Sequence, residues 1–287
     1  MRNQILQRIR DLLESESVAR ILAWKQGDFP NLTEPFVFTT LEQLENLVYD
    51  KFCAANLSKY LITLGEQEGT TLILLKPCDT YSFNQLVKER QIRREAVYIV
   101  GVSCNGNVAL EELEEKGLLE RCTVCDKNEH IVYDELICNG GKRQANNRFK
   151  EVLEVEAMGC DSRYNFWQKE LRRCIRCNAC RNACPSCHCK KCVFDNNKYE
   201  INQKANADSF EEQMFHIIRA YHVAGRCTDC GECCRVCPQK IKLNLLNRKF
   251  IKDINEFYGE FQAGANLAST NPLADFDAHR DGEVTHV

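Results

Sequence analysis

The first half of the chain alternates short apolar runs with amphipathic segments. The elements that this pattern predicts are a helix over residues 3–14, strands over 18–24 and 35–38, a largely helical segment over 41–63, a strand over 70–76, a helix over 81–91, a strand over 96–102 and a helix near 108–119. Strands that alternate with helices imply right-handed crossovers and parallel pairing. This half is therefore predicted to be an α/β domain.

The second half shows helical periodicity instead. The segment "SFEEQMFHIIRAYHVAG" places a capping box, Ser209 with Glu212, before an apolar stripe, and Gly225 stands where a C-terminal cap belongs. A second apolar stripe runs from Ile241 to Phe257. The glycines and polar run of residues 138–152 indicate a loop, so the joint between the halves is expected between residues 140 and 170.

Composition narrows the class of protein. The chain has 287 residues, 44% of them hydrophobic, which is enough for one large domain or two ordinary ones. A net charge of -3 argues against a nucleic-acid binder, and no apolar run approaches the roughly 18 to 20 residues of a membrane-spanning helix. The first residues contain no apolar secretion signal. We therefore expect a cytoplasmic protein, in which its 19 cysteines stay reduced and their clustering indicates metal binding.

Two cysteine motifs carry the strongest chemical signal. Both follow the spacing C-x2-C-x2-C-x3-C-P, one over residues 174–185 and the other over 227–238. In two-cluster ferredoxins the fourth cysteine of such a run binds the other cluster. The predicted ligands are Cys174, Cys177, Cys180 and Cys237 for one 4Fe-4S cluster, and Cys227, Cys230, Cys233 and Cys184 for the other. The alternatives are zinc sites or disulfides, although zinc sites usually combine separated ligand pairs.

Other residues near the motifs allow further interpretations. Cys234 offers a rival register and is interpreted as a spare. Cys187, Cys189 and Cys192, with His188, could bind another metal or act as groups around the clusters. The basic residues that flank the motifs would offset cluster charge, dock an acidic partner or simply be solvated; they are Arg172, Arg173, Arg176, Arg181, Arg226, Arg235 and Lys240. His188, His216 and His222 are each interpreted as structural or exposed.

A third site is predicted in the α/β half. In such sheets ligands gather beyond the carboxyl ends of the strands. Cys78 follows one predicted strand, Cys104 follows the next, and the pair Cys122 and Cys125 comes shortly after. These four thiols could hold a third cluster or zinc, or they could be buried as small apolar residues. Lys76, at the same strand end, could meet a phosphate or a flavin carbonyl, or be solvated.

The order of the motifs resembles a known family. The segments "KPCD", "VYIVGVSCNG", "CTVC", "CIRCNACRNACPSCHCKKC", "AGRCTDCGECCRVCP" and "NLLNRKF" are similar to the β-subunit family of deazaflavin-reducing hydrogenases and formate dehydrogenases. The likeness is greatest to bacterial relatives associated with heterodisulfide-reductase-like complexes, and it covers roughly residues 70–260. The helical motif region also resembles the two-cluster ferredoxin modules of succinate dehydrogenase iron–sulfur subunits and of the heterodisulfide reductase C subunit.

Together, the patterns along the chain predict a cytoplasmic α+β protein with three parts: an α/β domain over residues 1–160, an α-helical two-cluster ferredoxin domain over 161–260 and a C-terminal tail over 261–287. The resemblance implies an electron-transfer subunit of an anaerobic oxidoreductase complex whose partners are a catalytic subunit and a flavin or ferredoxin protein. Two alternatives stay open. One is a catalytic β subunit that binds FAD and passes hydride to a deazaflavin or nicotinamide carrier, although no G-x-G-x-x-G turn is found. The other is a zinc-organised binding module without a redox role.

Overall fold

The computed structural model describes four stretches of the chain, which are residues 2–111, 114–137, 144–195 and 210–274. The chain forms two compact units. Unit 1 comprises residues 1–147 with 264–267, and unit 2 comprises residues 148–263 with those from 268 onward. The predicted domain bounds of 1–160, 161–260 and 261–287 stay predictions, and residues 275–287 of the predicted tail lie outside the described residues.

Unit 1 is built on a six-stranded mixed sheet. Its strands are β1 (Arg20–Gln26), β2 (Thr33–Phe38), β3 (Leu47–Val48), β4 (Thr71–Leu75), β5 (Val97–Val102) and β8 (Glu135–Ile137). The order is β2-β1-β4-β5-β8, and β3 also pairs with β1. The strands β1, β4, β5 and β8 are parallel, whereas β2 and β3 run antiparallel to β1. Every residue of β4 is buried, as expected of a parallel strand covered on both faces.

Helices and single turns cover this sheet. They are α1 (Arg2–Glu14), η1 (Glu42–Asn46), η2 (Leu57–Tyr60), α2 (Leu61–Leu64), α3 (Pro77–Lys88), η3 (Arg94–Ala96) and α4 (Glu120–Thr123). The helix α3 starts immediately after β4, because Pro77 in its first turn has a backbone φ already suited to a helix and needs no N–H partner. This abrupt transition fixes where "KPCD" lies. Cys78 stands in the first turn of α3, at the carboxyl end of β4.

Most predicted elements of unit 1 are confirmed, but two segments are wrong. Residues 41–63 form short turns and the strand β3 instead of a largely helical segment. Side chains compete with the helix there: the Asp50 carboxylate accepts a hydrogen bond from Phe52 N, and the Asn56 side chain accepts one from Ser58 N.

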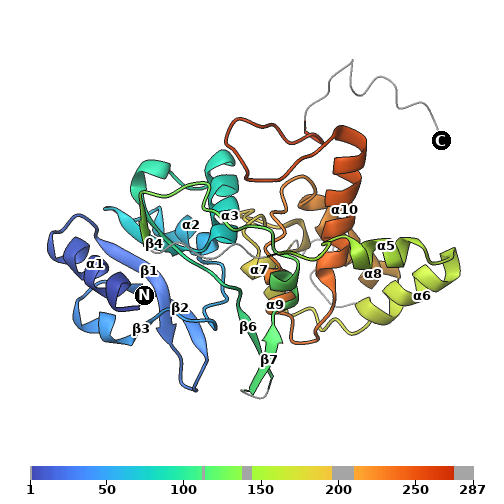
Figure 1. Cartoon of the computed structure of the whole chain (residues 1–287). Helices are drawn as coiled ribbons and strands as arrows, with labels where there is room; N and C mark the ends of the chain where they lie inside the picture. Colours follow the sequence, from blue (N-terminus) through green and yellow to red (C-terminus); the bar gives the residue numbers. More distant parts are fainter. Residues whose placement is uncertain (1, 112–113, 138–143, 196–209, 275–287) are drawn as a thin grey trace. The chain divides into compact units, whose positions relative to one another are not determined.

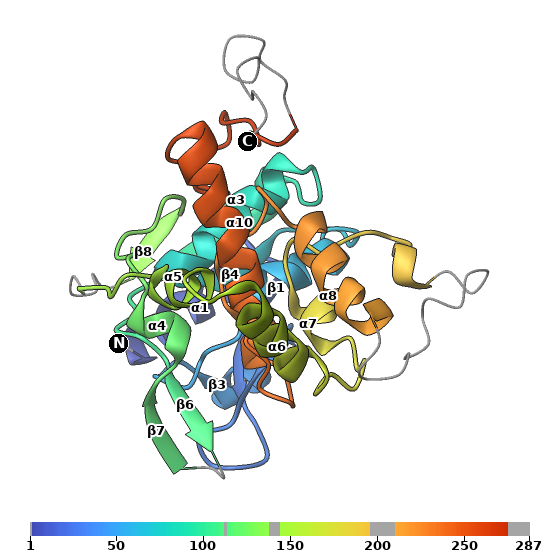
Figure 2. The ribbon, with the colours of Figure 1, turned by 90° about the vertical axis from the view of Figure 1, so that its right-hand side faces the viewer.

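Residues 108–119 form a hairpin rather than a helix. Its strands are β6 (Val108–Glu111) and β7 (Glu114–Leu118), and the hairpin projects away from the sheet of unit 1 in Figures 1 and 2. Gly117 has a φ of 83°, which is incompatible with a helix interior. Val108 N also donates to Lys51 O, so the start of the segment is held in an extended form.

Unit 2 contains helices and turns, and its described residues include no strand. Its elements are α5 (Lys150–Glu156), α6 (Cys160–Leu171), α7 (Ala179–Ala183), η4 (Val193–Asp195), α8 (Phe210–His222), α9 (Glu232–Arg235) and α10 (Leu243–Tyr258). The two predicted amphipathic helices are confirmed as α8 and α10, although Ser209 lies outside the described residues. Within unit 2, α10 packs against α5, α8 and α9, and Figure 2 shows α5 and α8 beside it. The α+β fold is thus confirmed, and no described helix of either unit has the length and apolarity needed to span a membrane.

Candidate metal centres

The two cysteine motifs of unit 2 share one backbone conformation. In each motif the residue two positions after the first cysteine has a positive φ, 55° at Arg176 and 58° at Asp229. The residue four positions after the first cysteine does as well, with 59° at Asn178 and 69° at Gly231. A one-turn helix then follows, α7 in one case and α9 in the other, and these two turns pack against each other. The repeat in the sequence is therefore a repeat in the structure.

Backbone and side-chain N–H groups point at the cysteine sulfurs. Arg176 N donates to Cys174 Sγ at 3.3 Å, and Ile241 N donates to Cys237 Sγ at 3.5 Å. The Asn247 amide of α10 lies 3.8 Å from Cys233 Sγ. Such hydrogen bonds stabilise thiolate sulfur and influence the potential of a metal cluster bound to it.

Each motif is fastened to a helix by a buried ion pair. Arg176 of the first motif binds Glu212 of α8 at 2.8 Å, and its guanidinium lies 3.7 Å from the ring centroid of Phe215. Asp229 of the second motif binds Arg248 of α10 at 2.9 Å. The equivalent position thus carries opposite charges in the two motifs, and each is neutralised by a different helix.

These contacts refine the interpretation of the basic residues that flank the two cysteine motifs. Three further arginines of this set are also paired with carboxylates: Arg173 with Glu170, Arg181 with Asp195 and Arg235 with Glu232. Their charges are therefore largely neutralised locally.

The first predicted ligand set surrounds one hollow. Its wall contains Cys174, Cys177 and Cys180 of the first motif together with Cys237 of the second. The structure thus brings together the four cysteines that the crossed assignment selected, from segments about 60 residues apart in the sequence. Their thiolates and the surrounding N–H groups fit an iron–sulfur cluster.

The second predicted set converges as well. Burial, and then the nearby carboxylate of Asp229 and thiol of Cys184, raise the pKa of Cys227 well above its ordinary value. Burial, followed by Cys184, likewise raises the pKa of Cys230. Cys184 also interacts with Cys233. Thiols in such surroundings stay protonated unless a metal draws off the proton, so the chemistry of this set also fits a metal-bound group.

The spacing of these sulfurs argues against single zinc ions. A zinc–sulfur bond of about 2.3 Å keeps all ligand atoms within about 4.6 Å of one another. Among the described residues, the only group of three or more His, Cys, Asp or Glu ligand atoms within 4.8 Å of one another is Cys174, Glu212 and His216. Neither predicted set of four cysteines is contracted around one ion, and a four-iron cube holds its ligands further apart.

The additional cysteines of unit 2 have other contacts. Cys234 Sγ lies 3.0 Å from the Asn244 side-chain oxygen and accepts a hydrogen bond from Asn244 N, which suits a residue outside the ligand sets. His188 contacts Arg226 at 2.7 Å. Within the described residues, the structure does not assemble Cys187, Cys189 and Cys192 with His188 into a compact ligand group.

Two site residues on α8 were missed by sequence reasoning. His216, interpreted as structural or exposed, is buried and lines the hollow with the four cysteines. Burial, and then Arg219 and Arg176, lower the pKa of His216 to about 3, so its ring is neutral in the protein without metal. Burial alone lowers the pKa of Arg219, but the surrounding cysteines reverse the effect and raise it. The signal available in the sequence was that His216 and Arg219 are three residues apart, which places them on the same face of one helix.

In unit 1, four cysteines gather beyond the sheet's carboxyl edge. A hydrogen bond with Cys125, and then burial, raise the pKa of Cys78 well above its ordinary value. Burial raises the pKa of Cys104, which also interacts with Cys122. Gly106 N donates to Cys104 Sγ at 3.4 Å and Asn107 N to Cys122 Sγ at 3.3 Å. The predicted third set is thus brought together as two neighbouring pairs.

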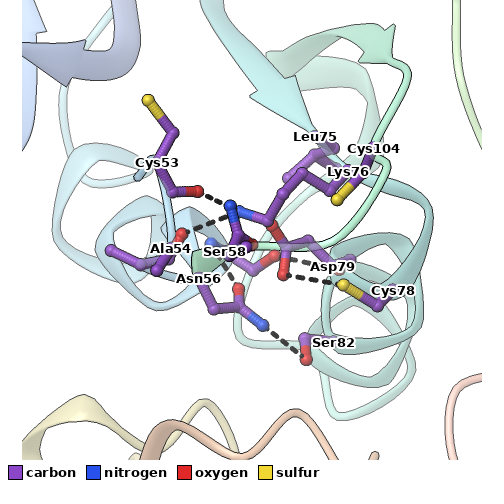
Figure 3. Close-up of polar contacts among 12 residues, drawn as sticks. Cys53, Ala54, Asn56, Ser58, Leu75, Lys76, Cys78, Asp79, Ser82 and Cys104 are labelled. Carbon is purple, nitrogen blue, oxygen red and sulfur yellow. Dashed lines mark hydrogen bonds and ion pairs between the residues drawn. The ribbon is translucent and has the colours of Figure 1, made fainter. Parts of the chain in front are cut away.

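Lys76 lies beside this set and is completely buried (Figure 3). Its ammonium group binds the Cys53 and Ala55 carbonyl oxygens at 3.1 Å each and Asp79 at 2.8 Å, and it lies 4.2 Å from the Trp24 ring centroid. All three of its N–H donors are used. Lys76 is therefore neither solvated nor available to a phosphate or flavin carbonyl, and Asp79 offsets the positive charge that it places near Cys78 and Cys104.

Comparison with known proteins defines the class. Residues 170–241, which include both motifs, match the family described as the 4Fe-4S dicluster domain. The iron–sulfur interpretation of this region is thereby confirmed, and the alternative of a zinc-organised module is not supported.

Two relatives are more specific. The chain is similar to the F420-dependent formate dehydrogenase subunit beta of Methanocaldococcus jannaschii, with 22% identity over 86% of this chain and 88% of the relative. It is also similar to the F420-dependent formate dehydrogenase 1 subunit beta of Methanococcus maripaludis, with 23% identity over 64% of this chain and 71% of that protein. These matches confirm the resemblance to the β-subunit family and the prediction of an iron–sulfur electron-transfer subunit.

Proposed function

We propose that unit 2 holds two 4Fe-4S clusters with crossed ligands and passes single electrons between them. The ligands are Cys174, Cys177, Cys180 and Cys237 for the first cluster, and Cys227, Cys230, Cys233 and Cys184 for the second. The observation that carries this proposal is the hollow whose wall combines three cysteines of one motif with the last cysteine of the other. Clusters of this kind exchange one electron each, and the protein residues fix their position and surroundings.

The chain would act as the β subunit of a cytoplasmic, multi-subunit oxidoreductase. Support comes from the names of the two relatives, both of which are β subunits of formate dehydrogenases. The partners would be a catalytic subunit that delivers electrons and a flavin or ferredoxin protein that receives them, or the reverse. The N–H groups of Arg176, Ile241 and Asn247 that point at cysteine sulfurs in unit 2 support a relay role.

A third metal centre in unit 1 is part of the proposal. Its ligands are Cys78, Cys104, Cys122 and Cys125. Among the described residues these sulfurs do not form a group as compact as a single zinc ion requires. A third iron–sulfur cluster is therefore the proposed occupant.

The test is anaerobic purification with iron, sulfide and flavin analysis of the wild type and of single variants. Three clusters correspond to about twelve iron atoms per chain and two to about eight. Cys177→Ala and Cys230→Ala are each expected to lose about four irons and to abolish electron transfer to a dye, while unit 1 stays folded. Cys78→Ala is expected to lose about four irons from unit 1.

Cys234→Ala is the matched control, since this cysteine belongs to neither set, and it is expected to keep its full iron content. Wild-type protein that is folded and colourless and contains zinc alone would overturn the relay. Iron content near eight that does not change in Cys78→Ala would overturn the third centre. Stoichiometric flavin would support the alternative of a hydride-transferring β subunit.

A further inference from the structure

The helix α8 presents two buried polar side chains on one face. His216 and Arg219 are three residues apart, and their exposed fractions are 1% and 3%. Both ring nitrogens of His216 lack a hydrogen-bond partner among the described residues, and so do Nε and one terminal nitrogen of Arg219. Leaving a buried donor unsatisfied destabilises a protein, and the effect is larger for a charged group. Such groups indicate that something else accepts their hydrogen bonds.

The surroundings of His216 show where its acceptor would lie. The ring lines the hollow formed by Cys174, Cys177, Cys180 and Cys237. One ring nitrogen of His216 lies within 4.8 Å of Cys174 Sγ. The only carboxylate in the same group, that of Glu212, is already bound to both Nε and a terminal nitrogen of Arg176. His216 therefore faces the first ligand set.

Arg219 lies near cysteines of both ligand sets. Its electrostatic partners are Cys180 of the first set, Cys233 and Cys184 of the second, and Cys187. Other buried arginines of unit 2 are matched with carboxylates, as Arg176 is with Glu212 and Arg248 with Asp229. No ion pair to a carboxylate joins Arg219 within the part of unit 2 that the structure describes, so its charge is directed at sulfur.

We propose that α8 is a hydrogen-bond donor to both clusters, with His216 serving the first cluster and Arg219 serving the two together. Both are positioning residues that raise the reduction potentials, because each cluster gains a negative charge on reduction and N–H donors stabilise that charge. Arg219 acts on both clusters in the same direction, so it shifts both potentials together. The inference rests on the proposed two-cluster function.

The experiment is a reductive titration of the complete chain, monitored by electron paramagnetic resonance, which measures the midpoint potential of each cluster. Arg219→Met keeps the length and apolar stem of the side chain and removes its charge and donors. It is expected to make reduction of both clusters about tenfold less favourable, a decrease of about 59 mV for a one-electron couple. His216→Leu is expected to lower one potential and leave the other unchanged.

Conservative and control variants separate this role from packing. Arg219→Lys keeps the charge and is expected to recover most of the shift, and His216→Gln, which retains an N–H donor, is expected to do the same for the first cluster. Arg172→Met removes an exposed arginine close to the first motif, so solvent screening should leave both potentials unchanged. Iron content is measured for each variant to verify loading.

Unchanged potentials in fully loaded Arg219→Met and His216→Leu would overturn the inference while leaving the clusters themselves established. Absence of clusters from the wild type would instead overturn the proposed function. If Arg219→Met fails to load, the two His216 variants decide. In that case equal first-cluster potentials in wild type and His216→Leu would count against the role of α8.

Discussion

The two units of this protein are stabilised in different ways. Unit 1 has one continuous apolar core that joins the inner strands, α1 and α3, with Trp24, Phe38 and Phe83 among its fully buried side chains. Unit 2 has small apolar clusters, and three of the six buried residues in the cluster at its motifs are cysteines, namely Cys174, Cys180 and Cys233. Ion pairs and polar side chains of α8 and α10 are buried beside them.

This difference shows what each unit needs in order to fold. Burial of apolar surface stabilises unit 1 by about 25 cal/mol per Å², without help from any ligand. In unit 2 the same contribution is smaller, and buried polar groups cost free energy unless they are paired. Binding of metal to the cysteines is then part of the folding free energy of unit 2.

Removal of iron is expected to have the largest effect on this comparison. Under reducing conditions with an iron chelator, α8 and α10 should lose their protection against hydrogen exchange, because their polar faces lose the groups that they surround. The strands β4 and β5 of unit 1 should stay protected. Hydrogen exchange followed by mass spectrometry measures both in one sample. Equal loss of protection in the two units would show that unit 1 also depends on metal.

A core truncation in unit 1 is expected to have the next largest effect. Phe83→Ala should lower the free energy of unfolding of unit 1 by about 3 to 5 kcal/mol, because it leaves a cavity beside β4. Denaturant unfolding followed by Trp24 fluorescence, in a Trp167→Phe background, measures it. Phe29→Ala, which alters a side chain that is 55% exposed, should change stability by no more than about 0.5 kcal/mol. An effect of Phe83→Ala no greater than this control would contradict the apolar-core account.

Breaking a surface ion pair of unit 2 is expected to have the smallest effect. Lys242 binds Glu151 at 2.8 Å, but the two side chains are 53% and 40% exposed. Lys242→Ala should therefore cost less than about 1 kcal/mol. Thermal loss of the iron–sulfur absorbance, compared between this variant and the wild type, gives the measurement. A decrease as large as that expected for Phe83→Ala in unit 1 would contradict the small contribution assigned to this surface ion pair.

The fold was predictable where one local pattern determined the structure. Continuous apolar runs identified β4 and β5, since strands buried on both faces need them, and helical periodicity identified α8 and α10. The hairpin β6–β7 was misjudged because its glutamates and leucines favour a helix locally, whereas pairing between strands and the positive φ of Gly117 decide the outcome.

The site was predictable in its ligands and much less so in its surroundings. Cysteine spacing alone selected both sets of four, because cluster geometry imposes that spacing. His216, Arg219 and the burial of Lys76 depend on how distant segments pack, and no short motif records this. The same holds for the equivalent positions Arg176 and Asp229. The sequence shows that their charges are opposite, but the reason appears when the structure places Glu212 beside one and Arg248 beside the other.

That reversal of charge has a consequence for assembly. The two cysteine motifs have the same backbone conformation, so each could in principle dock at the position of the other as the chain folds. Each cysteine would then lie beside the wrong neighbours. Arginine in one loop is attracted to the glutamate of α8 and repelled by the arginine of α10, while aspartate in the other loop has the reverse preference. The charges thus favour docking of the first motif against α8 and of the second motif against α10, and this preference does not require bound iron.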